Sequence, residues 1–161
     1  MKQSATKRRT SRPKLPKAPE EMRQWSACVL QEVLAWEGVR SRPMFGMTAV
    51  YRGAEIFGAL PRTRAMDSPY AVSFKLRRDS TTAARLDADP RIIVPEAAPM
   101  AGWVSFELRS GDDIPDAIRW FHLAWRHAGP KKGRRRSAAA PLGPRGRPGT
   151  DEGKVPTKLS D

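Results

Sequence analysis

The sequence predicts an α+β fold in which an N-terminal and a C-terminal helix pack on a sheet of about five strands, with a short helix between strands. Apolar residues recur at helical spacing near both ends of the aromatic-rich region. Between those ends, several runs alternate apolar and polar residues as strands do, and turns containing Gly or Pro separate them. The expected order is helix, hairpin, strand, short helix, two strands and helix.

The aromatic residues define the extent of the folded domain. All Trp, Phe and Tyr residues of the 161-residue chain lie between Trp25 and Trp125, and such side chains supply much of the buried area of a core. We therefore expect one domain over residues 18–128. Residues 1–17 are expected to be a disordered basic arm and residues 129–161 a disordered basic tail rich in Pro, Gly and Ala, because both flanks lack apolar surface.

The net charge of +13 is concentrated outside this domain. Residues 1–17 carry seven basic residues and no acid, and residues 129–161 carry nine basic residues and three acids. Residues 18–128 carry fourteen of each sign and are electroneutral. Long-range attraction for polyanions is therefore expected to come mainly from the two flanks.

The first helix is expected to begin at Pro19 and to stop at Gly38. Its buried face combines apolar residues at helical spacing, namely Met22, Trp25, Val29, Val33 and Trp36. Cys28 lies in this helix. We interpret it as a buried structural thiol rather than a reactive one, because an unpaired cysteine usually behaves as a small apolar residue. A single cysteine excludes an internal disulfide and fits a reducing cytoplasm.

Residues 42–60 form the centre of the predicted fold. Residues 42–46 are expected to form a loop, followed by two strands that a tight turn at Arg52-Gly53 joins into a hairpin. Glycine at such a turn supplies a positive φ, and we expect Gly46 to adopt a similar geometry. Phe45, beside it, is expected to pack inward.

The second half of the domain repeats these patterns. A third strand is expected over residues 70–76, and a helix capped by Asp79 or Ser80 must stop before Pro90. A short strand is expected at residues 92–94.

A longer strand is expected at residues 103–108. Val104, Phe106 and Leu108 are expected to face the core, Trp103 to cover the edge of the sheet, and the alternate residues Ser105 and Glu107 to face outward.

The last helix is expected to follow a turn at residues 110–113 and to end at Gly129-Pro130. Its buried stripe would contain Ile114, Ile118, Phe121, Trp125 and Ala128. Trp120 lies off this stripe, so it either marks a partner surface or is partly buried under a loop.

No motif in the chain indicates catalysis. The histidines, His122 and His127, are five residues apart and point in different directions on a helix, which argues against a metal pair. Asp87 and Asp89 are interpreted as surface residues at a helix end. We therefore expect a protein that is not an enzyme and uses neither cofactor nor metal. No apolar run approaches the ~20 residues of a membrane span, so we expect a cytoplasmic protein.

The segment Arg42-Pro43-Met44-Phe45-Gly46, followed by a hairpin with Gly53 in its turn, resembles the TfoX N-terminal domain family of competence regulators. The family pattern there is Arg-x-Met-Phe-Gly before a hairpin, although Met47 stands where a second glycine usually follows. The later half, with Trp103 opening a strand before a turn and a helix, is similar to the MmcQ/YjbR family. The resemblance implies a curved antiparallel sheet flanked by its terminal helices and a non-enzymatic role involving DNA.

The leading functional hypothesis is a non-catalytic regulatory module that binds nucleic acid without sequence preference. The expected phosphate contacts are basic residues of the flanks and loops: Lys7, Arg8, Arg9, Arg62, Arg64, Arg77, Arg78, Lys131, Lys132, Arg134, Arg135 and Arg136. The alternative is a domain that binds a small ligand or a protein through the sheet face, with the flanks serving solubility or electrostatic attachment. A contiguous positive patch formed by the four loop arginines would favour the first hypothesis, and an apolar groove rimmed by polar groups would favour the second.

Overall fold

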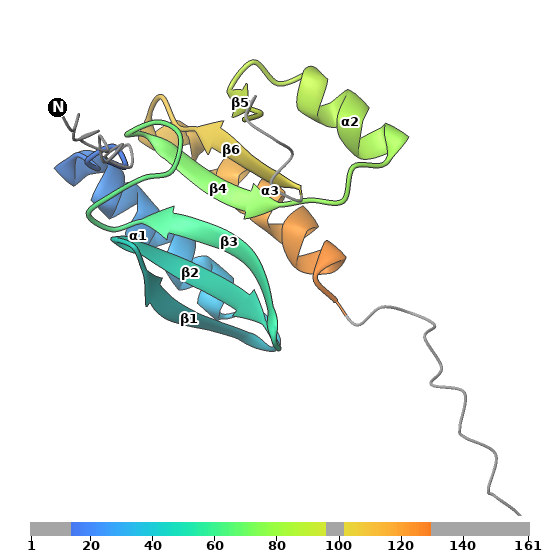
Figure 1. Ribbon diagram of the computed structural model, residues 1–161, viewed down its shortest axis with the longest axis horizontal. Helices are drawn as coiled ribbons and strands as arrows, with labels where there is room; N and C mark the ends of the chain where they lie inside the picture. The colour runs from blue at the N-terminus through green and yellow to red at the C-terminus, as the bar shows by residue number, and fades with distance from the viewer. Residues whose placement is uncertain (1–13, 96–101, 130–161) are drawn as a thin grey trace, which may run out of the picture. The chain divides into compact units, whose positions relative to one another are not determined.

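The computed structural model describes residues 14–95 and 102–129. It contains one open antiparallel sheet of six strands in the order β1-β2-β3-β4-β6-β5. Helices α1 (Glu20–Leu34) and α3 (Ile114–His127) lie behind this sheet in the view of Figure 1, and α2 (Ser80–Asp87) follows β4. The predicted α+β class is confirmed. Most of the expected basic arm and nearly all of the expected tail lie outside the described residues.

The sheet has one strand more than the sequence predicts. The strands are β1 (Val39–Met44), β2 (Met47–Arg52), β3 (Glu55–Pro61), β4 (Ala71–Lys75), β5 (Ile92–Ile93) and β6 (Trp103–Glu107). The additional strand is β1, whose second half was expected to be a loop. Residues 40–43 are all exposed, so no apolar alternation marks this edge strand. Pro43 is compatible with an edge, where one side needs no ladder hydrogen bonds.

The core lies between the helices and the sheet face that they cover. Its largest fully buried side chains are Phe57, Phe74, Phe106, Phe121, Met22, Leu60 and Leu108. Each such side chain contributes about 1.5–3 kcal/mol relative to an exposed position. Gly58 lets α3 lie against β3, because a Cβ atom at this position would be 2.4 Å from Cε1 of Phe121. The sheet therefore requires a residue without a side chain at this point.

The buried stripe of α3 is rotated relative to the predicted one. Phe121 and Ala128 are buried as expected, but Ile114, Ile118 and Trp125 are only partly buried. The remaining buried residues of the helix are Ala117, Trp120 and Ala124. Small alanine side chains let the helix approach the sheet, and the Trp120 ring stacks on Phe74 with centroids 5.7 Å apart. Trp120 is thus a core residue, not a partner surface.

Helix α1 buries the predicted face with two differences. Met22, Val29 and Val33 are fully buried, whereas the two tryptophans of the predicted face are half-buried. Cys28 is exposed, so its interpretation as a buried thiol is wrong. One residue along a helix is a rotation of about 100°, which carries Cys28 off the face that Val29 occupies.

The opposite face of the sheet is also covered at β4 and β6. Ser105 was expected to face outward into solvent, but it is 0 % exposed. Its hydroxyl lies 2.8 Å from that of Ser73 and donates to the carboxylate of Asp67. Ser68 donates to Glu107 in the same region. The loop between β3 and β4 therefore covers this part of the sheet and buries Ser73 and Ser105. Both serines alternate in sequence with residues of the core, so the strand pattern assigns them to the surface.

Candidate nucleic-acid interface

The turn between β1 and β2 displays an aromatic side chain to solvent. Phe45 is 83 % exposed, and its φ of 48° lies in the left-handed region. A non-glycine residue in this region costs of order 1–3 kcal/mol and persists only where its surroundings hold it. The expectation that Phe45 packs inward is therefore wrong. The chain accepts backbone strain here without gaining buried apolar area, which favours a functional role for the side chain.

The turn is held by the loop that follows β3. The carbonyl oxygen of Gly46 accepts the backbone N–H groups of Thr63 at 2.7 Å and of Arg64 at 3.0 Å, with the N–H of Arg62 at 3.3 Å. Gly46 has a φ of 79°, which confirms the predicted geometry. A Cβ atom on Gly46 would lie 2.7 Å from Cγ of Arg64 and 2.8 Å from Oγ1 of Thr63. The backbone of Arg62 and Arg64 is thereby held against the turn that carries Phe45.

These two arginines have different roles. The side chain of Arg64 is half-buried and donates to the carbonyl oxygen of Leu15 at 3.0 Å. Backbone hydrogen bonds from Ala18 to Thr63 and from Ala65 to Pro16 hold the same N-terminal segment against the loop. The side chain of Arg62 is exposed and forms no ion pair with any described residue. Of these two arginines, Arg62 is therefore the one whose guanidinium is available to a ligand.

A groove adjoins Arg62 on the side of α1. It has a volume of about 430 Å³ and is lined by Arg62, Thr63, Thr48 and Ser26 among others. The hydroxyl of Ser26 is buried and has no hydrogen-bond partner, the only such side-chain atom in the part of the chain that the structure describes. A buried hydroxyl without a partner is unfavourable. Because this hydroxyl is closed to solvent, the groove presents the exposed residues Arg62 and Thr63 to a ligand rather than Ser26.

The N-terminal basic residues are tied to this end of the molecule by the chain itself. Leu15 and Pro16 contact the Arg62–Arg64 loop, and Arg9 is five residues before Lys14. Lys7, Arg8 and Arg9 lie outside the described residues, as do Lys131, Lys132 and Arg134–Arg136.

Arg77 and Arg78 lie at the other end of the sheet. Strands β3 and β4 are antiparallel and pair Gly58 with Phe74. Arg62 and Arg64 follow β3, and Arg77 and Arg78 follow β4, so the two pairs lie at opposite ends of this strand pair. About seven residues of strand separate the two arginine pairs, or roughly 20 Å. The four loop arginines therefore do not form the contiguous patch that would have favoured the nucleic-acid hypothesis.

Two other basic residues of the region, Arg52 and Arg40, donate hydrogen bonds to the backbone, and a third, Arg42, is exposed. The guanidinium of Arg52 lies 3.8 Å from the ring centroid of Trp125 and donates to that residue's carbonyl oxygen at 2.9 Å. Arg40 donates to the carbonyl oxygen of Gly53, which has the positive φ expected for the β2–β3 turn. Arg42 is exposed on β1.

Two residues of the predicted structural motif are half-buried. Met44 ends β1, and Trp103 opens β6 opposite Lys75. Because β5 has only two residues and pairs further along β6, Trp103 lies beyond the end of that edge strand.

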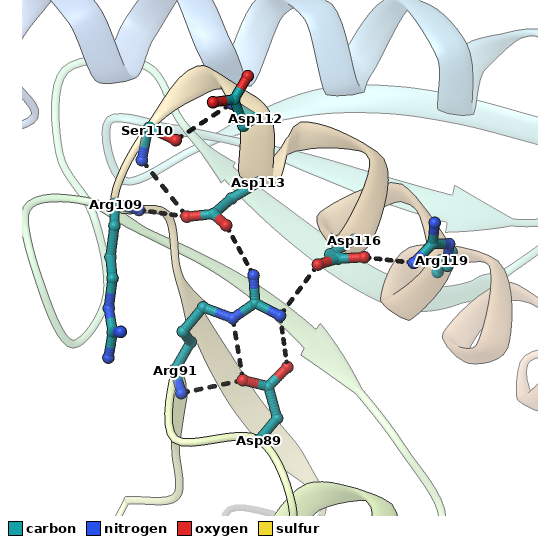
Figure 2. Close-up of polar contacts among 8 residues, drawn as sticks. All are labelled: Asp89, Arg91, Arg109, Ser110, Asp112, Asp113, Asp116 and Arg119. Carbon is teal, nitrogen blue, oxygen red and sulfur yellow. Dashed lines mark hydrogen bonds and ion pairs between the residues drawn. The ribbon is translucent and has the colours of Figure 1, made fainter.

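The densest polar cluster of the described residues surrounds Arg91 (Figure 2). Its guanidinium donates to Asp89, to Asp113 at 2.6 Å and to Asp116 at 3.0 Å. Asp113 also accepts the backbone N–H of Arg109 at 2.7 Å. The cluster joins the segment before β5 to the start of α3. Asp89 is therefore half-buried in an ion-pair network rather than a surface residue at a helix end.

The electrostatics of this cluster favour a structural role. The Arg91 hydrogen bond holds the pKa of Asp89 below its usual value. Burial alone would raise the pKa of Asp113, but the backbone N–H of Arg109 and the guanidinium of Arg91 outweigh it and lower that pKa. Both carboxylates are ionised at neutral pH, so neither is a general acid. Within residues 14–95 and 102–129, no group of three metal-ligating side chains is arranged to hold an ion.

The sequence interpretation missed Phe45 as a displayed side chain. The available signal was a Phe-Gly pair among arginines immediately before a strand, which is typical of a turn. No family model matches the chain, and neither a curated protein nor a solved structure matches it. The TfoX and MmcQ/YjbR resemblance stays a prediction. None of the helices in the described ranges is long and apolar enough to cross a membrane.

Proposed function

We propose that this protein is a non-catalytic module that binds single-stranded nucleic acid without sequence preference. The observation that carries the proposal is the exposed Phe45 ring, held in a strained turn whose Gly46 carbonyl accepts the backbone N–H of Arg62. An aromatic ring stacks on any unpaired base, worth about 1–3 kcal/mol per base, and an arginine fork matches phosphate oxygens. Proteins that bind single strands without sequence preference combine aromatic rings that stack on bases with cations that contact phosphates.

The N-terminal arm adds charge at the same end. Lys7, Arg8 and Arg9 are five to seven residues before Lys14 in the sequence, and Leu15 contacts Arg64. In this proposal Phe45 stacks on a base, Arg62 contacts an adjacent phosphate, and the arm neutralises further phosphates. Bases in a duplex have no free faces except at the ends, so single strands are expected to bind more tightly than duplexes of the same length.

The test measures binding of the full-length chain to a mixed-sequence single-stranded oligonucleotide by fluorescence anisotropy. Phe45→Ala is expected to weaken binding by about 5- to 150-fold, the affinity equivalent of one stacked base. Leu34→Ala is the matched control, because Leu34 is also an exposed apolar side chain but lies on α1. Arg62→Gln is expected to make the slope of log K against log salt shallower by about 0.7. Arg109→Gln removes the same charge elsewhere and serves as its control.

Two results would overturn the proposal. Equal affinities for the wild type and Phe45→Ala would show that the ring does not contact the nucleic acid. Absence of binding by the full chain at low salt would refute nucleic-acid association altogether. The exposed ring would then favour the alternative function, a protein-interaction domain, because aromatic residues are enriched at the centres of protein interfaces.

A further inference from the structure

A pocket lies at the end of the sheet opposite Phe45. It has a volume of about 320 Å³, at the lower end of the range for small-ligand sites. Residues from the start of β3, the end of β4 and the end of α3 line it. Its buried lining is apolar and consists of Phe57, Leu76 and Ala128. The pocket therefore has room and apolar contact surface for a compact organic group.

Basic side chains gather around this apolar lining. Lys75, Arg77 and Arg78 line the pocket together with one carboxylate, Glu55. None of these four forms an ion pair with a described residue. Three cations against one anion give the pocket a positive potential, and the exposed positions of Arg77 and Arg78 leave their guanidinium groups accessible to a ligand.

His127 adds an oriented hydrogen-bond donor. Its Nδ1 accepts the backbone N–H of Arg77 at 3.1 Å, so the proton of the neutral ring is on Nε2. Nε2 makes no hydrogen bond with the described residues. The ring is half-buried, and the charged groups near it are the carboxylate of Asp79 and the guanidinium groups of Arg77 and Arg126. It presents an N–H donor in a pocket that already favours negative charge.

We infer that this pocket binds a small organic phosphate whose ester group is compact and apolar. The phosphate would contact Arg77, Arg78 and the Nε2–H of His127, and the ester group would contact Leu76 and Ala128. A dianionic phosphate matches several cations better than a single carboxylate does. The site is independent of the Phe45 end, because roughly 20 Å of strand ladder separates the two.

The two histidines of the chain make a direct test possible. Phenyl phosphate is titrated into the full-length protein at pH 7 while the imidazole resonances are followed by proton–nitrogen NMR. The His127 resonances are expected to shift and saturate. Those of His122 are expected to stay in place, because His122 is exposed near Trp36 and Trp125 and does not line the pocket. Phenol and inorganic phosphate are each expected to bind at least ten-fold more weakly than phenyl phosphate.

Paired variants separate this site from the nucleic-acid interface. Arg78→Gln is expected to weaken phenyl phosphate binding at least five-fold, and Arg62→Gln, with the same charge change, is expected to leave it unchanged. Backbone amide spectra of each variant establish that it is folded. Phe45→Ala is expected to retain full phenyl phosphate binding even where it loses oligonucleotide binding. Equal effects of Arg78→Gln and Arg62→Gln, or unsaturable shifts of both histidines, would overturn the inference.

Discussion

The two ends of the β3–β4 ladder use similar residues in opposite ways. At one end the loop after β3 holds the backbone of Arg62 against Gly46, next to Phe45 in the sequence, whose ring projects into solvent. At the other end the segment after β4 places Arg77 and Arg78 beside a hollow whose apolar lining is buried. The first end is a projecting tip, which suits a polymer that passes across it. The second is concave, which suits a small anion that enters it.

The two ends differ in shape because the backbone N–H groups of the two loops bond to different partners. The loop after β3 gives its N–H groups to the carbonyl of Gly46 and thereby holds the β1–β2 turn, on which Phe45 is exposed. The segment after β4 gives the N–H of Leu76 to Gly102 and that of Arg77 to His127, which draws β6 and α3 together around the pocket. Arginine count alone therefore does not distinguish the two surfaces. The local hydrogen bonds do.

The largest expected effect comes from removing the support of the projecting end. Gly46→Val places a branched side chain at positive φ and against Arg64 and Thr63. We expect it to lower the free energy of unfolding by about 3–4 kcal/mol, the combined cost of strain and overpacking. Gly53→Val is the control, because Gly53 also has positive φ but a Cβ atom there meets nothing within 4 Å. We expect Gly53→Val to lower the free energy of unfolding by only about 1–2 kcal/mol.

Urea denaturation of both variants measures this difference. A Gly46→Val midpoint no lower than that of Gly53→Val would show that the loop after β3 does not hold the turn. The same pair sharpens the functional comparison. Under conditions where the variant remains folded, Gly46→Val should lose oligonucleotide binding and keep phenyl phosphate binding.

The second effect tests whether the Arg91 cluster is structural and separate from both ends. Arg91→Met leaves three half-buried carboxylates without their cation, and we expect a loss of about 2–3 kcal/mol, less than for a fully buried pair. The folded-state pKa values of Asp89 and Asp113 are lowered from 3.8. The contribution of these two carboxylates to the free energy of unfolding is therefore fully present above about pH 4. It is lost as the pH falls through their pKa values in the folded state. Arg91→Met should show a flatter stability profile below pH 4. A profile parallel to that of the wild type would contradict this account.

The sequence predicted the fold where packing decides the pattern. Phe74, Val104 and Phe106 alternate with smaller residues, and these strands were located correctly. Strand β1 was missed because an exposed edge strand has no apolar side to reveal it. The phase of α3 was wrong because Ile114 and Ile118 are more apolar than Ala117, although the sheet selects the smaller side chain where the helix approaches it.

The sites were less predictable for a related reason. Arg62 and Arg64 were singled out, and so were Arg77 and Arg78, but their grouping depends on strand direction and pairing. Burial of Ser105 depends on a loop that is distant in sequence. The orientation of Phe45 follows from hydrogen bonds to a segment eighteen residues later. No local pattern contains that information.

The third effect concerns charge at the projecting end. Replacing Lys7, Arg8 and Arg9 together by Gln in the full chain should make the slope of log K against log salt for single strands shallower by about 2, since each neutralised phosphate contributes about 0.7. Replacing Lys75, Arg77 and Arg78 together by Gln removes the same charge from the concave end and should change the slope by less than half as much. Salt titrations of both variants decide between the ends. Equal changes would show that binding follows total charge and not the Phe45 end.

The smallest effect concerns His127 at the concave end. Burial lowers its pKa below the ordinary value of 6.5, Asp79 opposes this, and Arg77 and Arg126 add to the lowering. The other charged groups of the pocket are Glu55, Lys75 and Arg78. Because the folded pKa is the lower one, the unfolded state binds more protons, so stability is complete above pH 6.5 and falls as the pH drops through the folded value.

An NMR titration of His127 should therefore give a midpoint below 6.5. Bound phenyl phosphate should raise that midpoint, because a dianion beside the ring favours the imidazolium. His127→Asn keeps an acceptor for the Arg77 N–H but does not titrate, and it should remove a pH dependence of less than about 1 kcal/mol between pH 5 and 7. A midpoint above 6.5 without ligand would mean that Asp79 outweighs burial and the arginines. The concave end would then carry less positive potential than its three basic side chains predict. The pocket should in that case prefer a dianion over a monoanion less strongly.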